Sequence, residues 1–334
     1  MESKKLNTAI DQGPLIGTAA NPLSSNTTIA LEKKGNMNKN TYCLYDGPSL
    51  LDGERVIVLA SGFANPSINS KTGDMIQTYI IRADIDPAEA AKLGMDESVC
   101  GTCELRPILV KLAKKKALDL FGQILDSVPC YVDKVRGPAG AWNSWNNGKV
   151  EYITPSEARK LIAELKTCPG KCAIDCKLDH THMLDNYPES GHARSTCKKA
   201  GHCTTDLGVR DGAYGDPGAV PLPIWLNLHG TGKRTSYTHR WETRPDMAAV
   251  AMASIDSQTY PDVHAALDRA HAMGFRTYRM LKFGEKIRRD EFLCPEAPDT
   301  SNIQCNTCGA CDGKPERATG RPNNMKSVAI PAIT

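Results

Sequence analysis

Residues 252–281 read Met252-Ala-Ser-Ile-Asp-Ser-Gln-Thr-Tyr-Pro-Asp-Val-His-Ala-Ala-Leu-Asp-Arg-Ala-His-Ala-Met-Gly-Phe-Arg-Thr-Tyr-Arg-Met-Leu281, and this stretch decides the fold. Its first five residues predict a strand, a helix then begins near Pro261 and ends at Gly274, and a second strand starts at Phe275. A strand, a helix and a strand of these lengths indicate a right-handed crossover between two parallel strands. The stretch therefore predicts an α/β fold.

The same rhythm of strand and helix precedes this stretch. Residues 207–210 are followed by Gly215-Asp216-Pro217 and by an apolar segment that ends at Leu228, and residues 235–241 then predict another strand. Repeated units of this kind build a parallel sheet. We therefore predict a partial (β/α) barrel or a mostly parallel sheet, with Cys-rich metal-binding loops.

The first half of the chain adds two strands and two helices to this prediction. The strands are predicted at residues 55–60 and 74–82, where apolar residues follow turn signals. A helix with lysines on its outer face is predicted from Pro107 to about Leu125. Thr154-Pro-Ser-Glu157 predicts the start of another helix, because Thr and Glu at this spacing form a capping box.

Composition sets the domain boundaries. Residues 1–40 are rich in Asn, Ser, Thr, Lys and Gly, and they have little apolar periodicity. Such a segment cannot offset its ordering entropy by burial, so we expect a disordered or extended tail. Residues 41–334 are predicted to form a single α/β metal-binding domain, with a Cys/His-rich insertion at residues 166–206.

The charge and hydropathy of the chain exclude several classes of partner. The 334 residues include 41 basic and 38 acidic side chains, and the net charge of +3 does not demand nucleic acid or an anionic membrane. No run approaches the roughly 20 apolar residues of a membrane helix, and the N-terminus lacks the apolar core of a signal peptide. We expect a soluble, cytoplasmic protein without a membrane partner.

The strongest motif is a four-cysteine group near the C-terminus. Cys305-x-x-Cys308-x-x-Cys311 follows Cys294, and Gly309 and Gly313 allow the backbone to wrap around a centre. In a reducing compartment, cysteines spaced in this way are more often metal ligands than disulfide partners. Four thiolates hold either a 4Fe-4S cluster or a zinc ion, and we expect the cluster with zinc as the alternative.

Two further cysteine groups precede it. Cys100-x-x-Cys103 is a common half-site, and the helix that follows can return Cys130 to its side. With three thiols, the fourth position is either another protein ligand or an opening for water or substrate. The insertion holds a third group of metal-ligand candidates, with four histidines nearby: Cys168, Cys172, Cys176, Cys197 and Cys203. The alternative for this third group is an exposed insertion without metal.

Polar residues are predicted at the carboxyl ends of the strands, where α/β proteins place their active sites. We take Asp216, His239 and Glu285 as catalytic candidates, and Asp256 shares this kind of position. Each has a simpler interpretation. Asp216 before Pro217 is a good helix N-cap, and a histidine is often only a hydrogen-bonded structural residue.

Several segments together carry a resemblance to a known family. They are residues 69–79, Ser98-Val-Cys-Gly-Thr-Cys103, Cys130-Tyr-Val132, Gly137-Pro138, residues 212–221, Ser236-Tyr-Thr-His-Arg-Trp241, residues 252–256, residues 275–279, Cys294-Pro295 and residues 305–313. In these segments the chain resembles the phage gene product 88 family, phage-encoded proteins of unknown function. The resemblance implies a viral protein in the host cell cytoplasm and covers seven cysteines, Cys100 to Cys130 and Cys294 to Cys311. Residues 113–128 and 168–203 depart from it and inherit nothing.

Three functions compatible with these features remain open. The first is a metal-dependent or redox enzyme that acts on a small or nucleotide-like substrate at the strand ends. The second is a non-catalytic module, braced by metal, that binds a nucleic acid or a host protein through Lys114 to Lys116, Arg234, Arg240 and Arg244. The third is a virion or assembly component. We favour the enzyme, without naming a reaction.

Overall fold

The computed structural model describes residues 39–64, 71–121, 130, 132–167, 205–230, 232–257, 260–295, 304–313 and 326–331. The chain divides into residues 1–36 and residues 37–334, and the described residues all belong to the second part. The predicted tail therefore lies outside the described residues, apart from its last two positions.

The first sheet contains six strands. Antiparallel neighbours β1, β2 and β3 form one half, and β7 and β8 extend the sheet from β3 in parallel. Val56 to Ala60 in β2 are all fully buried, because helices and loops cover both faces of this strand. In spatial order, the strands are β4 (Glu151–Tyr152), β1 (Thr41–Pro48), β2 (Arg55–Ser61), β3 (Met75–Arg82), β7 (Gly208–Tyr214) and β8 (Arg234–Thr235).

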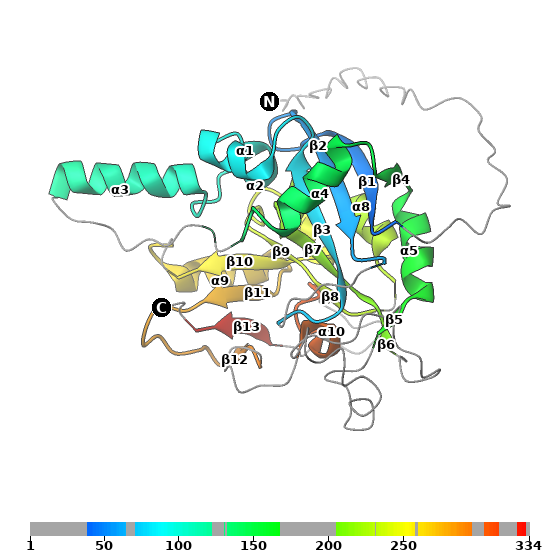
Figure 1. Cartoon of the computed structure of the whole chain (residues 1–334). Coiled ribbons are helices and arrows are strands. Elements are labelled where there is room, and N and C mark those ends of the chain that lie inside the picture. The colour runs from blue at the N-terminus through cyan, green and yellow to red at the C-terminus, as the bar shows by residue number, and fades with distance from the viewer. Residues whose placement is uncertain are drawn as a thin grey trace, which may run out of the picture. The chain divides into compact units, whose positions relative to one another are not determined.

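The second sheet contains five strands, and all its neighbours are parallel. Figure 1 shows them as successive layers of ribbon from β10 to β12. In spatial order, they are β12 (Glu291–Leu293), β13 (Ser327–Ile330), β11 (Thr277–Met280), β10 (Met252–Asp256) and β9 (Tyr237–Thr238). The sheet confirms the parallel pairing that residues 252–281 predict.

Ser236 joins the two sheets, since it lies between β8 of the first and β9 of the second. Its carbonyl oxygen accepts a hydrogen bond from the Met252 amide at 2.9 Å, and its own amide donates to the Cys311 carbonyl at 3.0 Å. Parallel pairing therefore continues from β3 through residues 234–238 to β12. The predicted strand at residues 235–241 is real only in part, because its second half turns away after Thr238.

Local signals explain the helices between these strands. Asp262 caps α9 (Val263–Ala272) by accepting a hydrogen bond from the Ala265 amide, and Gly274 ends this segment with a φ of 86°. α9 packs on β10 and β11, the two strands that it connects. Before it, η2 (Pro217–Ala219), α8 (Leu222–Leu228) and η3 (Pro245–Ala249) separate β7 from β10.

The remaining helices accompany the first sheet and the C-terminus. The predicted capping box at Thr154 and Glu157 is confirmed at the start of α5. α4 packs across β2 and β3, and α2 packs on the same two strands (Figure 1). These helices are α1 (Pro87–Leu93), α2 (Glu97–Cys100), α3 (Pro107–Phe121), α4 (Gly137–Asn146), α5 (Pro155–Glu164) and α10 (Cys305–Cys308).

The structure thus confirms an α/β fold with mostly parallel sheets and corrects two details. Strand β1 was not predicted, and the pairings among β1, β2 and β3 are antiparallel. At the ends of the predicted insertion, β5 (Lys166–Thr167) pairs with β6 (Thr205–Asp206), while residues 168–204 lie outside the described residues. Among the helices that the structure describes, none is long and apolar enough to cross a membrane.

Candidate functional site

A cavity of about 110 Å³ lies where the carboxyl ends of β7, β9, β10 and β11 meet the loop of residues 100–105 and the residues Cys130 and Val132. We call it the central cavity. It brings together three of the predicted metal ligands with two of the three predicted catalytic residues. Its polar and sulfur-bearing lining is Cys100, Cys103, Cys130, Arg210, Tyr214, Asp216, Tyr237, His239, Ser254, Asp256, Tyr278 and Met280.

The loop with Cys100 and Cys103 is held by backbone geometry and by one buried arginine. Gly101 follows α2 with φ 59° and ψ −135°, a conformation that side chains oppose. The Arg106 guanidinium donates to the Asp96 carboxylate at 2.9 Å and to the carbonyl oxygens of Gly101 and Gly94 at 2.8 and 2.6 Å. Arg106 is only 4% exposed, so it holds the loop from the interior of the protein.

Cys130 reaches this loop through its backbone. The Cys130 amide donates to the Leu105 carbonyl at 2.7 Å. This bond places Cys130 beside the loop of Cys103, although it lies 27 positions further along the chain. The predicted return of the chain to the first two cysteines is therefore present. The path that it takes, through residues 122–129, lies outside the described residues.

Asp216 ties the cysteine loop to β9. Its amide donates to the Val99 carbonyl at 2.7 Å, next to Cys100. Its carboxylate accepts hydrogen bonds from the Gly218 amide, the Thr238 hydroxyl and the His239 amide, each at 2.7 Å. The N-cap interpretation of Asp216 is thus confirmed at η2, and its carboxylate positions other groups.

His239 stands at the rim of the central cavity. Its side chain is 39% exposed, and its Nδ1 lies 3.9 Å from the Asp216 carboxylate. Desolvation lowers the pKa of His239, while the carboxylates of Asp216 and Asp256 oppose this shift. A neutral imidazole at the rim of a cavity has the chemistry of a proton acceptor.

A second, more open space adjoins the central cavity, and we call it the outer cleft. Its volume is about 430 Å³, and Cys103, Leu105, His239 and Asp256 line both spaces. Burial raises the pKa of the Glu104 carboxyl there, and the charge of Asp256 adds to the effect. The other residues of the outer cleft include Thr102, Arg240, Glu242, Tyr260 and Arg269.

The thiols of the central cavity lie among groups that repel a negative charge. Burial raises the pKa of Cys100, and Asp96, Cys103, Cys130 and Asp216 raise it further. Burial also raises the pKa of Cys103 to about 12. A nucleophilic cysteine has the opposite surroundings, with cationic neighbours that lower its pKa.

The C-terminal cysteines line a separate, smaller space of about 20 Å³, the C-terminal pocket. α10 presents two of them, and Gly309 ends this helix in the left-handed conformation with a φ of 64°. Cys294 follows β12, and its amide donates to the Ala329 carbonyl at 2.8 Å. The lining is Thr235, Cys294, Pro295, Gln304, Cys305, Cys308, Gly309, Ala310, Cys311 and Val328.

Arg276 and Gly313 fix the loop after α10. The buried Arg276 guanidinium donates to the Asp312 carboxylate at 3.0 Å and to the Ala310 carbonyl at 2.7 Å. Gly313 has a φ of 71°, and a Cβ atom there would lie 2.3 Å from the Ala251 amide nitrogen. The loop therefore packs tightly against the residue that precedes β10, and a side chain larger than that of glycine does not fit at position 313.

Two tyrosines lie between the central cavity and the C-terminal pocket. Tyr237 and Tyr278 line the central cavity, and their rings lie in tilted contact with centroids 4.3 Å apart. Both also pack against the apolar cluster that contains Cys311. The Tyr237 hydroxyl is hydrogen-bonded to the Cys311 sulfur, so one side chain contacts both sites.

The eight described cysteines form no disulfide. Within the same described residues, no three Cys, His, Asp or Glu side chains converge closely enough to hold a single metal ion. The two predicted cysteine sets line two separate spaces. The third set, Cys168 to Cys203, lies outside the described residues.

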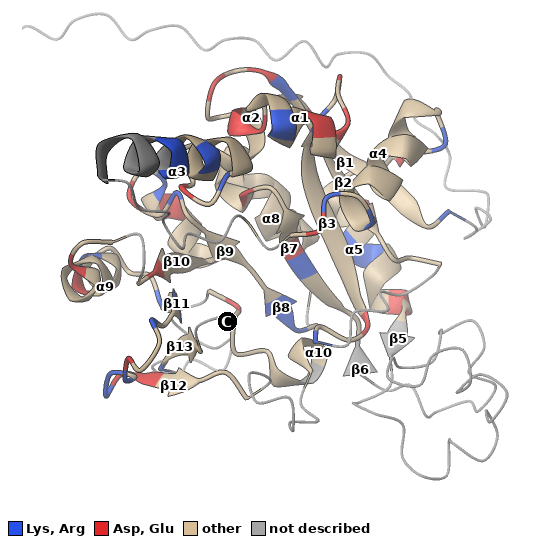
Figure 2. Cartoon of the chain, turned by 60° about the vertical axis from the view of Figure 1, so that its left-hand side comes forward, with Lys and Arg blue, Asp and Glu red and all other residues tan. Residues whose placement is uncertain are grey.

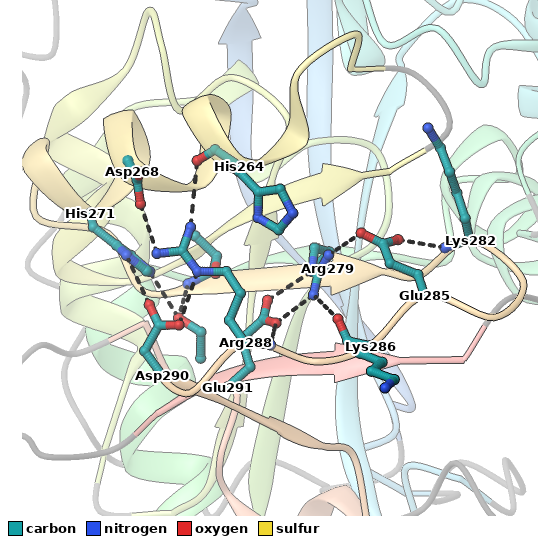
Figure 3. Close-up of polar contacts among 12 residues, drawn as sticks. His264, Asp268, His271, Arg279, Lys282, Glu285, Lys286, Arg288, Asp290 and Glu291 are labelled. Carbon is teal, nitrogen blue, oxygen red and sulfur yellow. Dashed lines mark hydrogen bonds and ion pairs between the residues drawn. The ribbon is translucent and has the colours of Figure 1, made fainter.

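Glu285 does not reach the central cavity. Side chains alternate along β11, so Tyr278 and Met280 face the cavity while Arg279 faces away from it. Arg279 is fully buried between Glu291, at 2.6 Å, and Glu285 (Figure 3). Burial opposes ionisation of Glu285, but the Lys282 amide and Arg279 outweigh it and lower its pKa. Glu285 supports the turn after β11.

The arginines proposed for nucleic-acid binding are engaged within the protein. Arg234 is buried and donates to the Asp312 carbonyl at 2.9 Å. Arg240 donates to the Thr102 hydroxyl at 2.6 Å, and Arg244 binds the Asp246 carboxylate at 2.7 Å. α3 carries basic segments, α2 carries an acidic one, and α1 carries one of each (Figure 2).

No protein-family model matches this sequence, and neither the curated proteins nor the solved structures compared with it give a significant match. The resemblance to the phage gene product 88 family stays a prediction. Sequence reasoning also missed Arg210, Tyr237 and Tyr278 as residues of the site. Their only signal is position within strands that the sequence predicts, since alternation along a strand decides which residues face a cavity.

Proposed function

We propose that this protein is a metal-dependent enzyme whose reaction takes place in the central cavity. Cys100, Cys103 and Cys130 would hold a metal centre with one position open to a small or nucleotide-like substrate. The observation that carries this proposal is their meeting with His239 and Asp256 in one cavity at the strand ends. The reaction is redox or metal-assisted chemistry.

We propose that the C-terminal cysteines hold a 4Fe-4S cluster, with zinc as the alternative. In a tetrahedral zinc site, four sulfurs converge on one ion at about 2.3 Å. In a 4Fe-4S cluster, each thiolate binds a different iron, so the sulfurs surround a larger body. Cys294, Cys305, Cys308 and Cys311 line one pocket and could supply either arrangement, and we propose the cluster. The cluster would relay electrons or brace the fold.

Two other features support the proposal. Parallel pairing is continuous from β3 to β12, which suits a partial (β/α) barrel with its site at the carboxyl ends of the strands. The resemblance to phage proteins would place the enzyme in the cytoplasm of the host cell. An interaction module without catalysis remains the alternative. Of the basic residues proposed for its binding surface, only the lysines of α3 would remain, because the three arginines are engaged within the protein.

Anaerobic purification followed by an absorption spectrum and by iron, sulfide and zinc analysis tests this proposal. We expect a brown protein with a broad band near about 400 nm, which indicates iron-sulfur clusters. Adding cyanide or imidazole should change the spectrum of the wild type, because a small ligand binds the open position. Cys130→Ser should lose this response, while Cys43→Ala, at a buried cysteine in β1, should keep it.

Two results would lead us to abandon the enzyme. One is a colourless protein with stoichiometric zinc at closed sites, and the other is a metal-replete protein whose spectrum no small ligand alters. Salt-dependent binding of DNA or RNA by such a protein would instead support the interaction module.

A further inference from the structure

Arg210 differs from the other arginines in the interior of this protein. It lies in β7, its side chain is half-buried, and it lines the central cavity. Among the described residues, its guanidinium has no hydrogen bond or ion pair. Every other buried or half-buried arginine of the described chain has a bonded partner: Arg82, Arg106, Arg234, Arg240, Arg244, Arg276, Arg279 and Arg288.

The surroundings of Arg210 favour a ligand as its partner. The cavity wall includes Tyr214, Tyr237 and Tyr278, so a charge there is partly removed from water. An unpaired charge in such a place is costly, and an opposite charge offsets the cost. The Asp216 carboxylate on the same wall already accepts three hydrogen bonds, which commit it to η2 and β9.

The guanidinium determines which chemistry the ligand has. Its planar fork of donors matches the two oxygens of a carboxylate or a phosphate, and such charge-assisted bonds are among the strongest in proteins. We propose that Arg210 holds an anionic oxygen group, a phosphate or a carboxylate, of the molecule that enters the central cavity. This deepens the proposed function, because it names the substrate class of that site.

The volumes define how such a molecule would lie. The anionic group, a phosphate or a carboxylate, would occupy the part of the central cavity of about 110 Å³ that Arg210 lines. The outer cleft, of about 430 Å³, adjoins it past His239 and Asp256. A ligand with its anionic end at Arg210 and a larger body in the outer cleft therefore fits both spaces.

Calorimetric titration of the full-length protein with inorganic phosphate and with acetate, at constant ionic strength, tests this inference. We expect saturable binding by the wild type. The affinity of Arg210→Gln should be lower by about tenfold or more, because glutamine keeps the size of the side chain and loses its charge. Arg210→Lys should fall between them, because the ammonium keeps the charge without the fork. Arg159→Gln, at an exposed arginine of α5, is the matched control.

The outcomes separate this inference from the proposed function. The anion that binds more tightly, phosphate or acetate, identifies the anionic group. Either result supports the inference if Arg210→Gln loses this binding. The result is independent of metal content, so a failed metal analysis would overturn the proposed function alone. Absence of saturable binding of both anions, equal affinities of the wild type and Arg210→Gln, or an equal loss in Arg159→Gln would overturn the role of Arg210. Unchanged near-ultraviolet circular dichroism verifies that the variants are folded.

Discussion

The two cysteine sets of this protein differ in what surrounds them. Three cysteines share the central cavity of about 110 Å³ with a histidine, two aspartates and an arginine, and this cavity adjoins the outer cleft. Four cysteines enclose the C-terminal pocket of about 20 Å³, whose other lining includes Pro295, Ala310 and Val328. A closed set of four thiols suits structure or electron transfer, and an open set of three beside polar groups suits chemistry.

The largest test of this difference exchanges one cysteine in each set for serine. Cys308→Ser should remove the C-terminal metal and lower the free energy of unfolding by several kcal/mol, because metal binding and folding are coupled. Cys103→Ser should lose the metal that we propose for the central cavity, with a smaller loss of stability, because Arg106 and Asp216 still hold its loop. Metal analysis and thermal unfolding measure both effects.

Cys43→Ala is the control for this pair. Its thiol is buried in β1 and donates to the Tyr45 carbonyl, away from both sets. It should keep the full metal content despite a loss of packing. Equal stability and metal content in Cys308→Ser and the wild type would remove the structural role of the C-terminal set.

Arg106→Met tests how the open set is held. The substitution leaves the Asp96 carboxylate buried without its guanidinium partner, which costs about 3–5 kcal/mol. Desolvation already raises the pKa of Asp96, and Arg106 opposes that shift. We expect a lower free energy of unfolding in denaturant and less metal in the central cavity, with the C-terminal metal retained. Arg136→Met, at an exposed arginine, should change neither quantity.

The parts of this fold that the sequence predicts depend on neighbours along the chain. β10, α9 and β11 follow from residues 252–281 because each boundary has a local signal, such as Asp262 or Gly274. β1 was missed because the apolar run Tyr42 to Leu44 is short and follows a polar segment. Its place beside β2 depends on pairing with residues 55–61, which no local pattern specifies.

The candidate site divides along the same line. The spacing of Cys100 and Cys103, or of Cys305, Cys308 and Cys311, is local, and so both groups could be recognised from the sequence. Arg210 comes to lie in one cavity with Cys100 and Cys103 only because β7 pairs with β3, across more than a hundred residues of chain. Glu285 was selected for its position after a strand, but its carboxylate binds the Lys282 amide and Arg279, which faces away from the cavity.

Gly313→Ala and Gly309→Ala test the packing of the closed set at two neighbouring positions. Both glycines have positive φ, so the conformational cost of a side chain is similar, on the order of 1–3 kcal/mol. At Gly313 the new methyl group meets the Ala251 backbone, whereas at Gly309 it meets the flexible Lys233 side chain. We expect Gly313→Ala to be the less stable protein in thermal unfolding. The reverse order would mean that the loop is not pressed against β10.

Tyr237→Phe has the smallest expected effect and examines the connection between the two sites. It removes the hydroxyl that hydrogen-bonds the Cys311 sulfur and keeps the ring that packs against Tyr278. The loss of one hydrogen bond should cost about 0.5–1.5 kcal/mol of stability. Since hydrogen bonds to the sulfurs help to set the reduction potential of a cluster, the C-terminal centre should become harder to reduce.

Redox titration followed by absorption separates this role from a purely structural one. Tyr278→Phe is the matched control, because Tyr278 is the other ring of the same pair. A shift in potential for Tyr237→Phe alone, with metal content unchanged in both variants, would show that the hydroxyl tunes the C-terminal centre. Equal reduction potentials in the two variants and the wild type would mean that Tyr237 only lines the central cavity. The two cysteine sets would then be neighbours without electronic contact.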